Sequence, residues 1–359
     1  MRFQSATKRL LAVLAICLAA SLPYVSSAGN YFVNDDFGVV QLLSQKPPLY
    51  FPRWFVTSWM DDIWGATQDE IRPFPAVTYQ LAALWGATSP VANHVTNIGF
   101  HAANALLVLG IARAVAALSF IASTYAAVAF AILPLHAESV VWITGRVDTI
   151  PALFFLGSFL AYAQWRRGEA TSTRLYLCSL VLFFCALFSK QNTIVMVATL
   201  LLYDLVAERL QRMFFGGEVA RYPFGYIAAL LVTAGTWFLV RSSGAASPRH
   251  ASSTVLFFGP CWWFLCLAPL VVVGYESTRH VYLASVGWAV IVGLVLHTVL
   301  HSRYAAARYA TLAATAGSLV FYAAGLQAEV ADWKTRARFR RKWSLTSSVR
   351  HSRHPKEAC

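Results

Sequence analysis

The stretch 174–206 reads RLYLCSLVLFFCALFSKQNTIVMVATLLLYDLV, and it contains two apolar runs separated by the polar sequence SKQN. A helix that crosses a bilayer needs about 20 mostly apolar residues. The two runs, 174–189 and 191–206, are therefore predicted to be short membrane spans that meet at a polar corner, where Lys190 lies. This stretch indicates an integral membrane protein.

The composition of the whole chain indicates the same class. Of 359 residues, 58% are hydrophobic and 13% are charged, whereas a soluble domain is about 45–50% apolar and about 25% charged. We expect an all-α polytopic membrane protein of about ten transmembrane helices, with 1–330 as the transmembrane domain and 331–359 as a basic C-terminal tail. The eight other predicted spans are 9–25, 92–112, 119–134, 149–165, 222–240, 254–274, 281–300 and 306–325.

The chain carries a formal net charge of +13, from 29 Lys and Arg against 16 Asp and Glu. Such a balance can indicate nucleic-acid binding. Here, however, the basic residues lie in loops between apolar runs, where topology and lipid headgroups account for them. We therefore expect membrane lipids, and no nucleic acid, as partners. The six cysteines lack zinc-type spacing, and all but Cys359 fall within apolar runs, so no metal site is predicted.

The basic residues also predict an orientation. Arg2, Lys8 and Arg9 place the N-terminus in the cytoplasm, so the first outer loop, 26–91, faces the periplasm or a lumen. Ten spans place the C-terminus in the cytoplasm too, and they put Tyr275–His280 on that side. One additional span before this segment would bring it to the outer side, together with the other polar loops.

The first apolar run allows two interpretations. Lys8 and Arg9, followed by the run and by the small residues Ser26, Ser27 and Ala28, resemble a cleaved signal peptide. The run is long for the apolar region of such a peptide. We therefore favour an uncleaved first helix that stays in the membrane.

Polar residues recur along the predicted span 92–112. His94, Asn97, His101 and Asn104 are separated by three, four and three residues, so they share one face of a helix. Polar groups inside a membrane face either other helices or an aqueous cavity. Hydrogen bonding between helices is one interpretation; direct contact with a substrate is the other, and it suits His94 best because His94 lies at the outer end.

The outer loops collect the charged residues. The loop after span 119–134 holds His136, Glu138, Arg146 and Asp148. With Lys190, these side chains offer cations for a lipid phosphate and acids that steer a hydroxyl, although ordinary salt bridges in loops are an alternative. The first outer loop is rich in acids and aromatic residues, and we expect it to contain interfacial helices.

Several distinctive pieces of sequence follow one another along the chain: NDD, DIWG, IRPFPAVTYQLAALWG, NHVTNIGFHAANALL, PLHAESVVWITGRVDTIPALFFLGSFLAY, FSKQNTIVMVATLLLYDL and ESTRHVYLASVGW. In this order they resemble the TMTC-type family of transmembrane and tetratricopeptide-repeat O-mannosyltransferases and their bacterial relatives. The resemblance extends over about 30–345 and implies the architecture of GT-C glycosyltransferases. In place of the repeats that the family would lead us to expect, the sequence ends soon after ADWKTRARFRRKW.

The resemblance implies transfer of a sugar, mannose in animal members, from a polyprenyl- or dolichyl-phosphate carrier to a Ser/Thr hydroxyl on the non-cytoplasmic side. The membrane would be a bacterial inner membrane or the endoplasmic reticulum. The family carries an essential acid in the first outer loop, where Asp35 and Asp36 stand here. We expect Asp35 to be the general base and Asp36 to orient it or the acceptor. Two adjacent acids should also raise the pKa of one of them.

Cations would stabilise the departing phosphate, and the donor would be the lipid-linked sugar without any other cofactor. Arg146 and Lys190 are the first two of these cations, and Arg279 is a third. Two alternatives stay open: a truncated or inactive relative that binds lipid or partners, and a transporter or lipid flippase. The remaining residues predicted to line a substrate pocket are His94, His136, Glu138, Asp148 and Tyr282.

Overall fold

The computed structural model describes residues 2–60, 70–83, 89–166, 173–208, 259–267, 278–302 and 304–352. All regular elements within these ranges are helices, so the predicted all-α class is confirmed. The long helices are α1 (Arg2–Val25), α4 (Pro90–Ala114), α5 (Phe120–Ala131), α7 (Arg146–Arg166), α8 (Thr173–Leu187), α9 (Met196–Glu208), α12 (Ser285–Leu300) and α13 (Ala305–Ser352). The connections carry α2 (Asp36–Ser44), α3 (Pro73–Ala83), α6 (Ala137–Val141) and the 3-10 turns η1 (Pro48–Phe55), η2 (Pro134–His136), η3 (Gln191–Val195) and η5 (Thr278–Val281).

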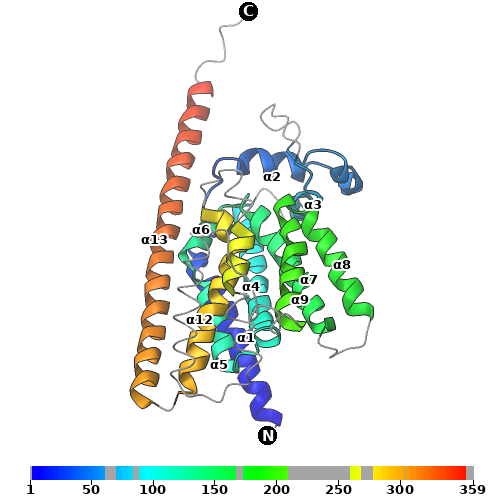
Figure 1. Ribbon diagram of the computed structural model, residues 1–359. Helices are drawn as coiled ribbons and strands as arrows, with labels where there is room; N and C mark the ends of the chain where they lie inside the picture. Colours follow the sequence, from blue (N-terminus) through cyan, green and yellow to red (C-terminus); the bar gives the residue numbers. More distant parts are fainter. Residues whose placement is uncertain are drawn as a thin grey trace, which may run out of the picture.

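The helices form a bundle whose two ends differ. Figure 1 shows α2 and α3 across one end of the bundle and the N-terminus at the other. Helix α13 stands at the flank, begins near the N-terminal end and finishes beyond the level of α2. The first outer loop and the basic end of α13 therefore lie at the same end of the molecule.

The predicted number of spans is not reached within the described residues. Among the described helices, four are long and apolar enough to cross a membrane, in α1, α4, α7 and α13, and a bent pair of α5 with η2–α6 makes a fifth. Helices α8 and α12 are apolar but shorter, because their apolar runs fall below the about 20 residues that a full crossing needs. The count of about ten is not confirmed; span 222–240 and most of 254–274 lie outside the described residues.

The position of η5 bears on the predicted sidedness. His280 of η5 lies 3.4 Å from the Lys190 Nζ atom, so the described part of this segment shares the end of the bundle that holds the other polar loops. Helix α1 begins and α13 finishes at opposite ends of the bundle (Figure 1). The side of the membrane on which each of these segments lies stays a prediction.

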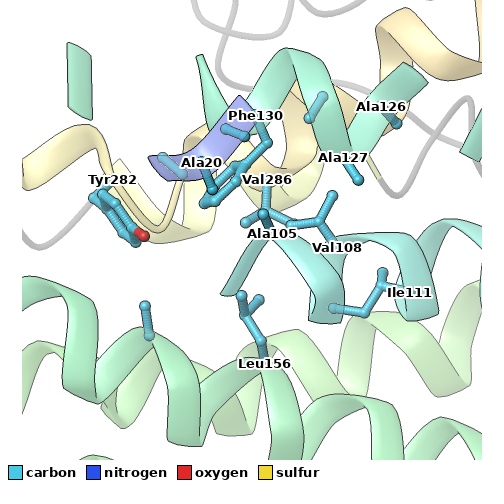
Figure 2. Close-up of a cluster of buried hydrophobic side chains, with 14 of the residues drawn as sticks. Ala20, Ala105, Val108, Ile111, Ala126, Ala127, Phe130, Leu156, Tyr282 and Val286 are labelled. Carbon is cyan, nitrogen blue, oxygen red and sulfur yellow. The ribbon is translucent and has the colours of Figure 1, made fainter. Parts of the chain in front are cut away.

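Small residues let the central helices approach closely. Ala105, Val108, Ala126 and Phe130 meet in the core, as Figure 2 shows. A Cβ atom on Gly293 of α12 would lie 2.9 Å from the Ala126 Cβ atom of α5, so only glycine fits there. Close helix packing of this kind is what stabilises bundles in lipid, where burial of apolar surface contributes little.

Helix α1 is an integral part of this core. Its residues Ile16, Ala20 and Tyr24 are fully buried and belong to the same cluster as the side chains of α4, α5 and α7. Whether this helix is retained or removed as a signal peptide stays a prediction.

The first outer loop forms a layer of its own. Its elements α2, η1 and α3 enclose a second apolar cluster, which also includes Ile143 and Val147 at the start of α7. Trp54 and Trp59 are almost completely buried in it. The buried aromatic residues of this loop therefore pack it against the end of the bundle. Asp61, Asp62 and Asp69 lie outside the described residues.

The polar stripe of α4 joins helices together, as one of the two interpretations predicted. Asn97 Nδ2 donates to the carbonyl oxygens of Trp142 at 2.9 Å and Ile143 at 3.1 Å. His101 Nε2 donates to a carbonyl oxygen of α5, so its Nδ1 accepts from the Tyr282 hydroxyl at 2.7 Å. Asn104 Nδ2 donates to the same hydroxyl at 3.1 Å. Tyr282 thus ties the segment after η5 to α4.

Replacing Tyr282 by Phe should lower the free energy of unfolding, although the aromatic ring keeps its shape. The change leaves His101 Nδ1 buried without a donor, which costs about 1–3 kcal/mol. Thermal unfolding in detergent measures the effect. Tyr309→Phe is the matched control, since Tyr309 is 73% exposed on α13, and equal unfolding temperatures for the Tyr282 variant and the unaltered protein would contradict the network.

Candidate functional site: an acidic pocket and a cation cluster

The acid pair lies in a turn that separates its two side chains. Asn34, directly before the pair, has a φ of 52°, in the left-handed region that Asn tolerates better than most residues. The turn places Asp36 at the start of α2 and inside the protein, where it is 2% exposed. Asp35 is only partly buried. Adjacent acids therefore occupy different environments.

Asp36 connects two loops through hydrogen bonds. Its Oδ2 atom accepts from the Val33 N–H at 3.0 Å, and its Oδ1 atom accepts from the Thr144 N–H at 2.8 Å and the Thr144 hydroxyl at 2.7 Å. Burial raises the pKa of Asp36 to about 6; the three hydrogen bonds oppose this rise and the charge of Asp35 adds to it. The expected raised pKa is confirmed, although burial is its larger cause.

Asp35 lines a pocket of about 470 Å³ at the end of the bundle. The other lining residues are Asn34, Phe37, Trp142 and Arg340. The Asp35 side chain precedes α2 without capping it, and no hydrogen bond or ion pair holds its carboxylate within the described part of the chain. The carboxylate is thus available to a ligand, between two aromatic walls and a guanidinium.

Arg146 does not line this pocket and is fully buried. Its guanidinium donates to Asn97 Oδ1 at 2.8 Å and to both oxygens of Asn93 at 3.1 Å, and it lies 4.3 Å above the Tyr79 ring. Arg146 therefore joins α3, α4 and α7. Hydrogen bonds to the protein already engage most of its donors, which leaves few for a phosphate. Its role at a phosphate stays a prediction.

The turn before Arg146 requires glycine. A Cβ atom on Gly145 would lie 2.8 Å from the carbonyl oxygens of Glu138 and Ser139 and 2.9 Å from that of Trp142. Three backbone oxygens leave no room for a side chain. The sequence TGR thus folds into a tight corner that directs Trp142 toward the pocket and Arg146 into the bundle.

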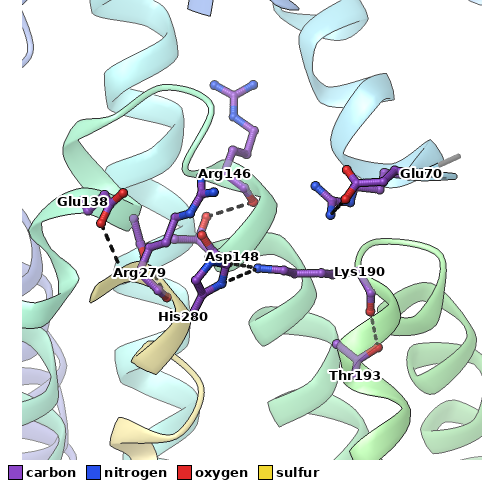
Figure 3. Close-up of polar contacts among 11 residues, drawn as sticks. Glu70, Glu138, Arg146, Asp148, Lys190, Thr193, Arg279 and His280 are labelled. Carbon is purple, nitrogen blue, oxygen red and sulfur yellow. Dashed lines mark hydrogen bonds and ion pairs between the residues drawn. The ribbon is translucent and has the colours of Figure 1, made fainter. Parts of the chain in front are cut away.

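A cluster of charged residues lies close to the start of α7, and Figure 3 shows how Asp148, Lys190, Arg279 and His280 converge. The Lys190 ammonium pairs with the Asp148 carboxylate and lies 3.4 Å from His280 Nδ1. Burial lowers the pKa of Lys190, and the Asp148 charge opposes this. Burial, reinforced by Lys190, lowers the pKa of His280 to about 4. His280 is therefore neutral near pH 7 and can accept from Lys190.

Arg279 connects the cluster with the pocket. Its guanidinium lies 4.7 Å above the Trp142 ring, and its Nε atom is buried without a hydrogen-bond partner among the residues described. Glu138 holds the Arg279 segment by accepting from the Thr278 hydroxyl at 2.9 Å. Trp142 thus contacts Arg279 and also lines the pocket of Asp35. The structure brings the acid and the cations to one end of the bundle, but not into one cavity.

The predicted histidines and Tyr282 lie inside the bundle. His94 is 2% exposed, and its Nε2 atom lies 3.2 Å from the Asn30 carbonyl oxygen. His136 is fully buried, with Nε2 at 2.7 Å from the Ser285 hydroxyl, and Tyr282 belongs to the α4 network. None of the three lines the Asp35 pocket. Their predicted role in a substrate pocket stays a prediction.

Four pocket residues were not predicted: Asn34, Phe37, Trp142 and Arg340. The first two lie beside the acid pair, so proximity to that motif was a usable signal. Arg340 is far away in the sequence. Its signal was periodicity, because it extends a helical face that begins with apolar residues of α13.

Together these features define an all-α membrane protein that carries, at one end of its bundle, a pocket lined by Asp35 and Arg340 and a cluster of charged residues. The chain is 28% identical over 204 residues to Protein O-mannosyl-transferase TMTC3 of Mus musculus, covering 55% of this chain and 21% of that protein. It is 30% identical over 223 residues to Protein O-mannosyl-transferase TMTC4 of Mus musculus, covering 54% and 29%. It is 27% identical over 225 residues to Protein O-mannosyl-transferase TMTC1 of Mus musculus, covering 58% and 23%.

These similarities confirm the resemblance to TMTC-type O-mannosyltransferases that the sequence pieces indicated. A comparison with protein families finds no match. The chain spans 21 to 29% of the length of the mouse relatives it matches. The similarity therefore concerns one part of those longer proteins.

Proposed function

We propose that this protein is a membrane glycosyltransferase of GT-C type. It moves a sugar, mannose by its relatives' names, from a polyprenyl- or dolichyl-phosphate carrier to a hydroxyl of a protein acceptor on the non-cytoplasmic face. The observation that supports the proposal most is the Asp35 carboxylate, which lines a pocket and forms no hydrogen bond within the described chain. Arg279 lies 4.7 Å above the ring of Trp142, which also lines this pocket.

In the proposed reaction, Asp35 takes the proton of the acceptor hydroxyl. The acceptor oxygen forms a bond to the anomeric carbon of the sugar, and the bond between this carbon and the phosphate oxygen breaks. The phosphate leaves with the bonding electron pair. Arg279 and Lys190 stabilise the charge that develops on it, while Asp36 keeps the turn of Asp35 fixed through Val33 and Thr144.

A transfer assay tests this function. The purified chain is reconstituted in vesicles with radiolabelled polyprenyl-phosphate mannose and Ser/Thr peptides. Formation of labelled peptide supports the proposal. If neither peptide nor water receives the label from polyprenyl- or dolichyl-phosphate mannose, the proposed function is wrong.

The pKa of Asp36 predicts how transfer depends on pH. Below about pH 6 this carboxyl gains a proton and can no longer accept all its hydrogen bonds, so the Asp35 turn loosens and transfer falls. The Thr144 hydroxyl lowers the pKa of Asp36. Thr144→Val should therefore raise that pKa and move the acidic limb of the rate profile to higher pH.

Initial rates of transfer between pH 5 and pH 8 measure this shift. Thr57→Val is the control, because Thr57 bonds only to a backbone oxygen of its own loop. An acidic limb at the same pH in the unaltered protein and in Thr144→Val would contradict a role for Asp36.

A further inference from the structure

Helix α13 is much longer than a membrane crossing requires. Its 48 residues extend over about 72 Å at about 1.5 Å per residue, against about 30 Å of hydrocarbon. In the middle part of the helix, the side chains that face the bundle are Leu326, Val330, Trp333 and Ala337, and all are buried. Their spacing of four, three and four residues marks one helical face. Three residues later, the same face presents Arg340.

Arg340 differs from the other cations of this segment. It lines the Asp35 pocket and forms no ion pair or hydrogen bond with a described residue. Arg336, one turn earlier, pairs with Asp332 at 2.6 Å. The pocket thus holds one acid and one base that do not pair with each other, so each is available to a different group of a ligand.

We propose that Arg340 makes the Asp35 pocket selective for acidic acceptor peptides. The Ser or Thr hydroxyl would face Asp35, and the carboxylate of a neighbouring Asp or Glu would pair with Arg340. This inference rests on the proposed function and adds the acceptor class. Phe37 and Trp142, the aromatic walls of the pocket, would cover the apolar part of the peptide.

The charge of this region favours an acidic peptide as the occupant. The surrounding segment is basic, with Lys334, Arg338 and Arg341 nearby, which favours acidic ligands.

Peptide binding tests the inference directly. Three fluorescent peptides with one Ser, flanked by Glu, Gln or Lys, are titrated against the full chain in nanodiscs. We expect the Glu peptide to bind about tenfold more tightly than the Gln peptide, which corresponds to about 1.4 kcal/mol. Arg340→Gln should abolish this preference. Arg338→Gln is the matched control, because Arg338 is exposed and lies off the buried face, and it should keep the preference.

Several results would overturn the inference. These are equal binding of the Glu and Gln peptides to the unaltered protein, an unchanged preference in Arg340→Gln, or the same loss in Arg338→Gln. Displacement of the Glu peptide by anionic phosphatidylglycerol vesicles, dependent on Arg340, would identify a lipid headgroup as the occupant instead.

Sugar transfer to the same peptides separates this inference from the proposed function. Transfer without any preference for the Glu peptide would support the proposed function and refute the selectivity for acidic peptides. Binding with the expected preference but without transfer from any carrier leaves the anion site in place and refutes the proposed function.

Discussion

Replacing Asp35 by Asn is expected to lower sugar transfer by about 10²- to 10⁴-fold, the usual contribution of a positioned general base. The amide keeps the size of the side chain and cannot take a proton. The fold should be unaffected, because the Asp35 carboxylate neither caps α2 nor bonds to a described residue. Initial rates with saturating donor and acceptor measure the effect.

Two further variants make this test specific. Asp332→Asn removes an exposed acid outside the pocket and should leave transfer unchanged. Asp36→Asn places an amide N–H group against three donors, so it should lower stability as well as transfer. Transfer at the normal rate by Asp35→Asn would exclude Asp35 as the base.

Replacing Arg279 by Met should lower the transfer rate by about 10²-fold, the usual loss when one group that stabilises developing charge is removed. The Arg279 guanidinium lies over the Trp142 ring, with Nε unpartnered in the described structure. A partly buried contact of this kind is worth about 1–2 kcal/mol, so folding should survive. Lys190 is a less suitable residue for this test. Replacing it would leave the Asp148 charge buried and unpaired, which costs about 3–5 kcal/mol of folding free energy.

The control for Arg279 is a second arginine on an aromatic ring. Arg53 lies 5.4 Å above the Tyr50 ring in the first outer loop, so Arg53→Met loses the same kind of contact without touching the cluster. Arg279→Lys should keep part of the activity because it keeps the charge. Equal transfer rates for Arg279→Met and Arg53→Met would exclude Arg279 from the phosphate site.

Much of the bundle could be predicted because apolar run length and polar spacing are local properties of the sequence. The apolar runs within the described residues became helices, and the α4 stripe became a set of interhelical hydrogen bonds. The number of crossings could not be predicted in this way, since α8 and α12 are apolar but short. The side on which η5 lies depends on chain crossings rather than on its own residues.

The candidate site was only partly predictable for a related reason. Arg146 and Arg279 are both arginines in polar loops, and the sequence favoured Arg146. In the structure Arg146 is fully buried and bonded to Asn97 and Asn93, whereas Arg279 is partly exposed beside Trp142. Availability to a ligand depends on which neighbours satisfy a guanidinium, and those neighbours come from distant segments.

The sequence by itself determined the class of this protein, because long apolar runs with few charges are stable as helices in a bilayer. Short pieces of sequence, in a fixed order along the chain, also indicated which proteins it resembles. Only the tertiary structure decided which acid of the pair is available and which cations lie near it. A left-handed turn at Asn34 and the hydrogen bonds of Thr144 bury Asp36 and leave Asp35 in the pocket. Contacts between residues far apart in the chain set that difference, and no local pattern encodes them.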